Sequence, residues 1–290
     1  FSTDRTVVSI RGWMYEFSEG DEDVYASASV REDEIIRSTD FTLGGVFGID
    51  LLDGSKIILS PRVVAAWRPR DWFKLNAELG LDNWLPSLSH EILLMPEFDP
   101  YLESPESVRE KFVTISGQAV LSRMFEVSVS LDYRDASDMV YFTDSSDGYL
   151  DMMTMESCEF LTFKLEASFW LTDSLKLFGT HTLSYAYPGD GHEWYPYLPR
   201  SHTLLGARFD FLDDWTLSTE LEIVGEVYVN SNSSGTLAPY EVLTVQLEYN
   251  IEHYLKVYAR ASNLANEGFN EYKGWRGYEK MFYFGLEITF

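Results

Sequence analysis

Five histidines are the side chains of this sequence best suited to acid–base or metal chemistry, and their spacing forms no recognisable catalytic set. His181 lies in register with the apolar residues of an alternating segment, and His253 lies in a predicted turn. His90 and His192 lie in predicted loops, and His202 lies near the end of a predicted strand. A Ser-His-Asp set is assembled in space rather than along the sequence. With no set indicated, we predict that the chain is not an enzyme and has no catalytic residues.

A long predicted loop over 85–109 contains five carboxylates that could offer oxygen ligands to Ca²⁺. They are Glu91, Glu97, Asp99, Glu103 and Glu106. Their spacing matches no calcium-binding loop, so solvated acid is the better interpretation. Cys158 is the only cysteine, which excludes an internal disulfide and leaves the redox compartment undetermined. We expect no metal site and no cofactor.

Glycines and tryptophans could mark a phosphate cradle or a stacking platform. Three glycines within a predicted strand more readily mark bends or close packing than a cradle. They are Gly44, Gly45 and Gly48. Four tryptophans lie at predicted strand ends, where interfacial anchoring is favoured over base stacking or sugar binding. They are Trp67, Trp72, Trp84 and Trp215.

The formal net charge of −25 argues against broad binding of nucleic acid or anionic lipid. Much of the acid falls in predicted loops, such as Glu19, Asp21, Glu22, Asp23, Asp144, Asp147 and Asp151. We interpret these runs as solvated loops. The alternative is that they attract cationic ligands or divalent ions near lipopolysaccharide.

The elements that position these residues have a period of two. Apolar side chains alternate with polar or charged ones, as Leu243, Val245 and Leu247 do with Thr244, Gln246 and Glu248. Successive side chains of a strand point to opposite faces. The pattern predicts 14 antiparallel strands near 6–17, 23–31, 39–50, 56–68, 72–84, 110–121, 124–136, 157–170, 174–187, 200–211, 215–229, 240–250, 254–262 and 280–290.

The predicted connections alternate in length. Short turns fall near 68–71, 122–123, 172–173, 212–214 and 250–253, and long loops near 85–109, 137–156, 188–199, 230–239 and 263–279. Near the N-terminus the alternation weakens, because 51–55 is short and 32–38 is a poor turn. Outer-membrane barrels have short periplasmic turns and longer extracellular loops. We therefore expect an all-β, up-and-down transmembrane barrel of about 14 strands, with both termini in the periplasm.

A single domain over 1–290 is expected, because one closed sheet absorbs the whole length and no linker is apparent. Aromatic residues make up 16% of the chain, which suits interfacial girdles. No run of about 18 apolar residues occurs, so a transmembrane helix is excluded. A soluble β-sandwich also alternates, but charge on nearly every polar face and the many edges it would leave count against it.

Several motifs resemble the C-terminal part of the barrel of TonB-dependent outer-membrane receptors. Phe41-Thr-Leu-Gly-Gly45, Leu59-Ser-Pro-Arg62 and Trp67-Arg-Pro-Arg-Asp-Trp72 resemble a recurring stretch with a "W-R-P" turn. Further along are Trp84-Leu-Pro-Ser87, Leu102-Glu-Ser-Pro-Glu106, Asn263-Leu-Ala-Asn266 and the C-terminal segment Tyr283-Phe-Gly-Leu-Glu-Ile-Thr-Phe290. The last resembles the signal read by the barrel assembly machinery, with Ile288 where a second aromatic is common. The resemblance covers roughly 40–290.

The sequence departs from that family in ways that bear on function. Family members have a 22-stranded barrel, a plug domain and a TonB box, whereas this chain has no room for a plug and shows no TonB box before Thr6. We expect a plugless barrel in the bacterial outer membrane that anchors an envelope assembly. A passive, porin-like channel for small solutes and the C-terminal part of a larger receptor are the alternatives.

The expected interior is charged. On the polar faces lie Arg62, Lys74, Lys164, Arg208, Lys256 and Arg260, with Glu78, Glu126, Glu166, Glu220, Glu222 and Glu248. The expected outer face includes Phe284, Leu286, Ile288, Leu243, Leu247, Leu165 and Phe169.

A barrel of about 14 strands is too wide for side chains alone to fill. The 85–109 loop, with its apolar Ile92–Met95 run, is expected to fold into the mouth or dock another protein chain. The other expected partners are outer-membrane lipid, lipopolysaccharide and the assembly machinery, with no nucleic acid.

Overall fold

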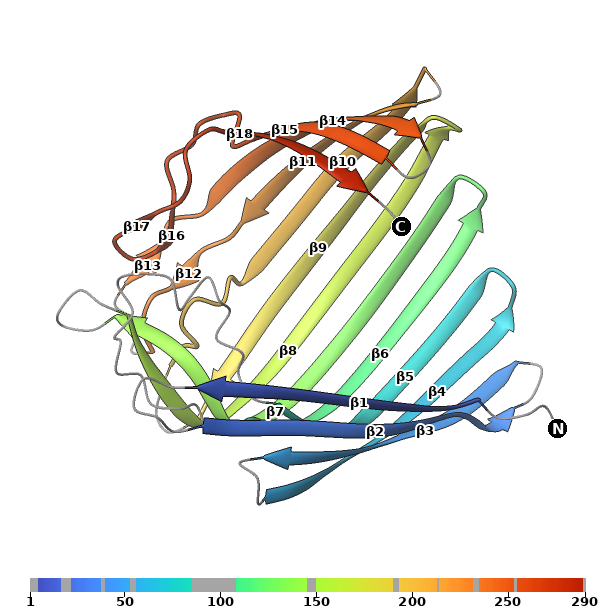
Figure 1. The fold of residues 1–290 in the computed structure, drawn as a ribbon, viewed down its shortest axis with the longest axis vertical. Coiled ribbons are helices and arrows are strands. Elements are labelled where there is room, and N and C mark those ends of the chain that lie inside the picture. Colours follow the sequence, from blue (N-terminus) through green and yellow to red (C-terminus); the bar gives the residue numbers. More distant parts are fainter. Residues whose placement is uncertain are drawn as a thin grey trace.

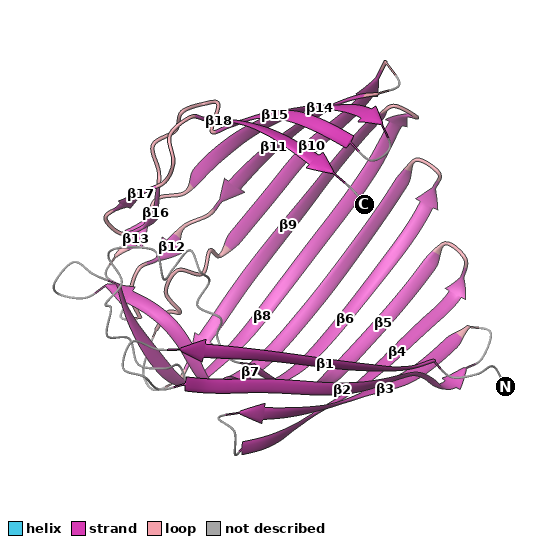
Figure 2. Ribbon diagram, viewed as in Figure 1, coloured by secondary structure: helices cyan, strands magenta, loops and turns pink. Residues whose placement is uncertain are grey.

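The fold is one large antiparallel sheet, which a computed structural model describes for residues 5–16, 22–37, 40–52, 56–84, 108–144, 150–189, 193–212, 214–231, 235–252 and 255–288. Fourteen strands follow one another in sequence order, each paired with its neighbours in the chain's up-and-down path (Figure 1). Within the described residues, no helix is long and apolar enough to cross a membrane. All ordered structure is strand or loop in these ranges (Figure 2).

The strands of the large sheet agree with the 14 that the alternation predicts. They are β1 (Arg5–Glu16), β2 (Glu22–Arg37), β3 (Phe41–Leu52), β4 (Lys56–Arg70), β5 (Phe73–Trp84), β6 (Val108–Ser122), β7 (Phe125–Asp144), β8 (Leu150–Thr172), β9 (Leu175–Pro188), β10 (Ser201–Phe211), β11 (Trp215–Val224), β14 (Tyr240–Glu252), β15 (Leu255–Ser262) and β18 (Met281–Ile288). Two small hairpins lie outside this sheet: β12 (Val227–Tyr228) with β13 (Thr236–Leu237), and β16 (Asn270–Tyr272) with β17 (Trp275–Arg276).

Both ends of the sheet lie at the same rim. In Figure 1, β1 begins and β18 ends on the side where tight turns join β4 to β5, β6 to β7 and β8 to β9. The opposite rim holds the small hairpins β12–β13 and β16–β17. The expected placement of short turns beside the termini is confirmed for these turns, and the 263–279 connection lies at the opposite rim as expected. Most of the 85–109 loop lies outside the described residues.

The sheet is open rather than closed. Its order runs from β1 to β18, so these two strands are its edges within the described chain. Figure 1 shows β1 and β18 on opposite sides of a wide interior. The closed 14-stranded barrel that the sequence favours is therefore not what the structure shows. The number of strands does not by itself determine how strongly a sheet curves, so it cannot predict whether the sheet closes into a barrel.

The hairpin β7–β8 corrects the predicted loop over 137–156. Its strands stay paired from Ser137↔Ser157 and Met139↔Met155 to Asp144↔Leu150. Asp138 between them adopts a φ of 59°, a left-handed conformation that turns the chain. Beyond this point the buried side chains change from even to odd positions on β7, from Ala136 to Tyr141. The reversal of faces hides the strand from a test for strict alternation.

Two other predicted boundaries are also wrong. The poor turn expected over 32–38 lies largely within β2, which continues to Arg37 through a register shift between Glu32 and Ile36. A bulge of this kind absorbs extra residues without ending the strand. The strand expected over 215–229 ends at Val224, because Val227 and Tyr228 leave the wall to pair with Leu237 and Thr236.

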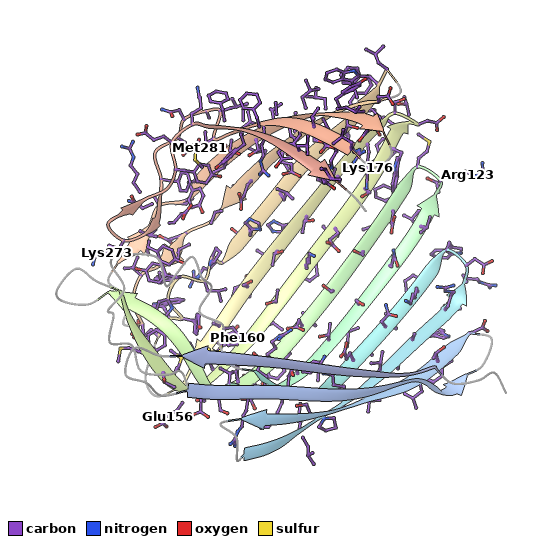
Figure 3. The ribbon with its side chains drawn as sticks, in the orientation of Figure 1. Arg123, Glu156, Phe160, Lys176, Lys273 and Met281 are labelled. Atoms are coloured by element: carbon purple, nitrogen blue, oxygen red, sulfur yellow. The ribbon has the colours of Figure 1, made fainter. Side chains whose placement is uncertain are left out.

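The two faces of the sheet differ as alternation predicts. Phe284, Leu286 and Ile288 are exposed on the outer face, with Phe284 the most exposed at 84%. Glu287 between them turns the other way and ion-pairs with Lys256 of β15, at 2.7 Å. Side chains extend from both faces of the strands in Figure 3. The outer face is therefore an apolar surface of the kind that outer-membrane barrels present to lipid.

Candidate functional site at the loop rim

The inner wall of the sheet carries ion pairs between neighbouring strands. Arg62 of β4 lies 2.5 Å from Asp82 and 3.6 Å from Glu78 on β5. On β15, Lys256 reaches Glu248 of β14 as well as Glu287 of β18. These contacts confirm an inward orientation for part of the charged set that the sequence assigns to the interior. The charges are paired along the wall, so they line a polar interior rather than form an isolated catalytic group.

Two buried hydrophobic clusters lie at the rim that holds the long connections. One buried cluster joins Val224, Val227, Val229 and Leu237, with Tyr197 and Tyr240 packed against it. A second joins Tyr141, Met155 and Cys158, with Met139, Phe160, Ala186 and Tyr195 against it. The rings of Tyr197 and Tyr272 lie 5.0 Å apart and connect residues 193–200 to the β16–β17 hairpin. The rim is thus a packed layer of loops on top of the wall.

A stack of two rings and a guanidinium group lies within this layer. Trp194 and Tyr228 are nearly parallel, with centroids 4.1 Å apart and an interplanar angle of 9°. The guanidinium carbon of Arg200 lies 4.3 Å from the centroid of Trp194 and 4.9 Å from that of Tyr228. A cation held against aromatic faces is attracted by their quadrupoles. The arrangement orders a cationic group at the rim without a carboxylate.

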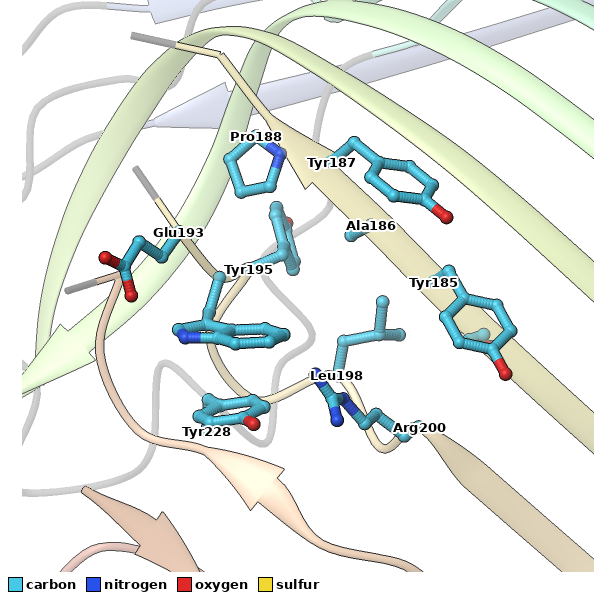
Figure 4. Close-up of a pocket in the computed structure, with 11 residues that line it drawn as sticks. Tyr185, Ala186, Tyr187, Pro188, Glu193, Tyr195, Leu198, Arg200 and Tyr228 are labelled. Carbon is cyan, nitrogen blue, oxygen red and sulfur yellow. The ribbon is translucent and has the colours of Figure 1, made fainter. Parts of the chain in front are cut away.

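The stack lines a pocket beside the end of β9. Its cavity is about 420 Å³, and Figure 4 shows the side chains around it. Tyr195 also lines the pocket, and its ring lies 5.1 Å from that of Phe160. Burial raises the pKa of Tyr195, with Cys158 and Tyr141 adding to the effect, so this phenol stays neutral. Tyr195 therefore adds no charge to the pocket.

Loop 263–280 is organised by a buried amide. Asn263 is fully buried and adopts a φ of 51°. Its Nδ2 donates to the carbonyl oxygens of Glu267 and Tyr278, and its Oδ1 accepts from the N–H of Glu267. The Asn-Leu-Ala-Asn motif therefore has a structural explanation here. It closes the loop on itself and presents no free group to a ligand.

Carboxylates gather near the inner mouth. Glu222 of β11 lies 2.7 Å from Nε2 of His202 on β10. Partial desolvation raises the pKa of Glu271, an exposed residue of the β16–β17 hairpin, and the nearby charge of Glu222 raises it further. Within the described ranges, no three His, Cys, Asp or Glu residues are grouped closely enough to hold a metal ion. These groups thus make an acidic mouth with no metal-ligand set.

The histidines of the described chain do not converge. His181 Nδ1 lies 2.8 Å from the Thr203 hydroxyl, in the odd-numbered outward register of β9 and β10. His202 contacts Glu222 on the inner face. His90, His192 and His253 lie outside the described residues, as do the acidic residues of the 85–109 loop and its Ile92–Met95 run. The expected capping of the mouth by that loop stays a prediction.

The tryptophans chosen from the sequence lie at the short-turn rim or outside the described side chains. Trp67 and Trp72 are exposed there, and Trp215 lies 4.7 Å from Tyr249 in a ring cluster. Trp84 has no described side chain. The rim stack of Trp194 and Tyr228 was missed, because Trp194 falls in a predicted loop and Tyr228 falls within the strand predicted over 215–229. The sequence does show aromatic residues over 194–197 close to Arg200. It does not show that Tyr228 lies beside them in the fold.

The curved antiparallel wall, its apolar outer face and its charged inner face define the class of fold, that of the walls of outer-membrane β-barrels. No protein-family description and no curated protein matches the sequence. Solved structures do match: the copper transporter OprC has a TM-score of 0.68 at 13% identity, over 93% of this chain and 48% of OprC. The ferric-catecholate import receptor Fiu of E. coli K12 has 0.65 at 13%, over 97% and 45%.

A third similar structure is the ferric enterobactin receptor PfeA of Pseudomonas aeruginosa in a ligand complex, with a TM-score of 0.69 at 12% identity. The match covers 94% of this chain and 46% of PfeA. The chain therefore has the fold of TonB-dependent receptor barrels and spans less than half the length of each. These neighbours are transporters and receptors rather than enzymes.

Proposed function

We propose that this chain forms the C-terminal part of the barrel wall of a TonB-dependent outer-membrane receptor, which imports a solute through its lumen. The open edges at β1 and β18 carry the proposal. Within hydrocarbon every backbone polar group needs a partner, so an edge facing lipid does not persist. Strands from outside this sequence would complete the wall. A 22-stranded transporter barrel is wide enough for a plugged lumen.

The shares of matched length support the same proposal. Three receptors and transporters are covered for only 45–48% of their lengths, while 93–97% of this chain is matched. If these 14 strands closed into a barrel of their own, the sheet would have to curve more tightly than it does as a segment of a 22-stranded barrel. The wide, open curvature is therefore better suited to a segment of a larger wall. Location in the outer membrane is part of this proposal.

A plugless barrel remains the competing proposal, as an anchor for an envelope assembly or as a porin-like channel. Both require β1 to pair with β18. The inner ion pairs, such as Lys256 with Glu287, suit a polar lumen in all three cases. Closure of the wall therefore separates the proposals, and conductance then separates an anchor from a channel.

The test is disulfide cross-linking in native membranes with a Cys158→Ser background. Phe284→Cys is combined in turn with a cysteine at each of Val8, Ile10 and Gly12 of β1, and at their neighbours. Cysteines on paired strands cross-link only when their Cα atoms lie within about 7 Å. We expect no cross-link between β1 and β18 in any register. The matched control is Ala259→Cys with Phe284→Cys, a directly opposed pair that should form a disulfide.

A β1–β18 cross-link in one consistent register would overturn the receptor proposal in favour of a closed 14-stranded barrel. In that event planar-bilayer conductance distinguishes the remaining pair. A large, steady conductance indicates a channel, and its absence indicates an anchor or a filled lumen. Deleting 89–100 should then raise the conductance if that loop fills the mouth.

A further inference from the structure

A notch opens in the wall where β9 continues beyond the start of β10. The last paired residues are Leu183 and Ser201, and Ser184 then donates its N–H to the carbonyl of Arg200, at 3.0 Å. Backbone groups of alternate residues point to the same side of a strand. The N–H and C=O of Ala186 therefore face the notch, where β10 offers no partner. One donor and one acceptor of the strand edge are thus directed into the cavity.

Aromatic side chains surround this notch. The cavity of about 420 Å³ has the size of a small-molecule site. Tyr185 and Tyr187 line it from the outer side of β9, and residues 193–200 with Tyr228 line it from the other side (Figure 4). Rings present broad apolar faces together with polar tips. The lining therefore suits a ligand that has both apolar faces and many polar groups.

The aromatic platform is held in place before any ligand binds. The N–H groups of Glu193 and Trp194 both donate to the carbonyl of Ser231, at 2.9 and 3.2 Å. Tyr197 N–H donates to the carbonyl of Tyr228, at 2.8 Å. These bonds join the two segments that supply the stacked rings. A prearranged platform lowers the ordering cost of binding.

The charges of the pocket oppose one another without pairing. Arg200 and Glu193 both line it, and within the described part of the chain neither makes an ion pair. Figure 4 shows Glu193 on the far side of the ring stack from Arg200. A free carboxylate disfavours an anion, and a guanidinium disfavours a cation. The indole N–H of Trp194 is also buried without a partner. A neutral ligand rich in hydroxyl groups fits this combination.

We propose that the notch is a saccharide-binding site at the loop rim. The C–H face of a sugar ring would lie on the aromatic lining, and its hydroxyls would meet Arg200, Glu193 and the edge groups of Ala186. A peptide strand fits poorly, because Pro188 lacks an N–H and ends the free edge two residues after Ala186. The sugar could belong to an outer-leaflet glycolipid or to a soluble oligosaccharide. The site lies in the wall, so it does not depend on import through the lumen.

Saturation-transfer NMR tests the proposal. The sample is the protein extracted with detergent from its native membrane, with its barrel wall intact. The probes are the neutral outer-core oligosaccharide of lipopolysaccharide, freed of its acyl chains and of its acidic inner core, and maltohexaose as a neutral soluble glycan. Arg200→Gln should weaken binding about ten-fold, as expected for loss of hydrogen bonds to a charged group. Trp194→Ala should abolish it, whereas Trp194→Phe keeps a ring and should keep most of it. Arg208→Gln removes the same charge at the other rim and serves as the control.

Each outcome either supports or overturns the saccharide-binding proposal. Site-dependent transfer to the core oligosaccharide alone supports a glycolipid ligand, and transfer to maltohexaose supports a soluble glycan. No transfer from the folded wild-type protein to either probe overturns the proposal. Transfer that is equal in wild type, Arg200→Gln and Trp194→Ala also overturns it, because the sugar then binds elsewhere. Heat-modifiable mobility on gels shows that each variant is folded.

Discussion

The side chain of Asn263 donates a hydrogen bond to the backbone carbonyl of Tyr278, 2.9 Å away, and so joins the two ends of the last long loop. The same Nδ2 donates to the carbonyl of Glu267, and Oδ1 accepts from the N–H of Glu267. Asn263 is fully buried, so these bonds exclude water. One side chain thus joins the two ends of the loop beyond Ser262 and Met281, where the pairing of β15 with β18 stops.

Asn263→Ala should therefore loosen the loop without unfolding the wall. Leaving buried donors and acceptors unsatisfied costs about 1–3 kcal/mol for each group. Hydrogen exchange of residues 264–280 should accelerate, while exchange in β14 and β15 stays at the wild-type rate. Asn266→Ala is the control, because Asn266 is exposed and accepts one longer bond from the N–H of Lys280. Equal acceleration in both variants would contradict a special role for Asn263.

The wall could be predicted from the sequence because its physics is periodic. A two-residue alternation specifies both the strand and its buried face, and all 14 strands of the large sheet are found this way. Prediction fails where the period is broken. At Asp138 the positive φ reverses the faces, and at Val227 the chain leaves the wall to form a hairpin of its own.

The candidate site could not be predicted, because its parts come together only in three dimensions. Trp194, Arg200 and Tyr228 lie on two connections that share no repeat. Alternation also cannot predict whether the sheet closes on itself, because the same strand repeat occurs in a narrow barrel and in part of a wide one. The inner charges, by contrast, follow directly from register, as Lys256 with Glu287 shows.

Arginine at an outer position of β14 should be far more costly than arginine at its inner neighbour. Leu247 faces outward opposite Ala259 and Leu217, and Gln246 faces inward, where it donates to Glu248. Arg on the lipid face near mid-membrane costs about 2–4 kcal/mol. We expect that loss for Leu247→Arg and little for Gln246→Arg, measured by urea unfolding in lipid vesicles. Similar losses for the two would show that the outer face does not meet lipid.

The β16–β17 hairpin should be less stable at neutral than at mildly acidic pH. Partial desolvation raises the pKa of Glu271, and the charge of Glu222 raises it further. The folded loop therefore binds more protons than the unfolded loop between the ordinary carboxyl pKa and the raised value. The stabilisation is fully present below the ordinary value and is lost as pH rises through the raised one.

Glu271→Gln should remove that dependence and slow proteolysis of residues 264–280 at neutral pH. Protease susceptibility between about pH 4 and pH 7 measures it, with an enzyme active over that range. The control is Glu279→Gln, which changes the same charge in the same loop at a residue paired with Arg276. A pH slope that survives in Glu271→Gln would assign the effect to another group.

A side chain at Gly285 of the last strand should destabilise the wall. This glycine lies directly opposite Tyr258 of β15, and the ring of Tyr258 occupies the space that a β-carbon would need. Gly206 and Phe178 repeat the arrangement between β10 and β9. An aromatic ring over a cross-strand glycine covers the backbone and fixes the register of the pair.

Gly285→Ala should therefore destabilise the barrel by about 1–3 kcal/mol, the usual cost of overpacking, measured by urea unfolding in vesicles. The double variant Gly285→Ala with Tyr258→Ser should recover part of the loss, because the ring is no longer there to be displaced. If the double variant is less stable than the sum of the two single changes, the ring is not what makes Gly285 necessary.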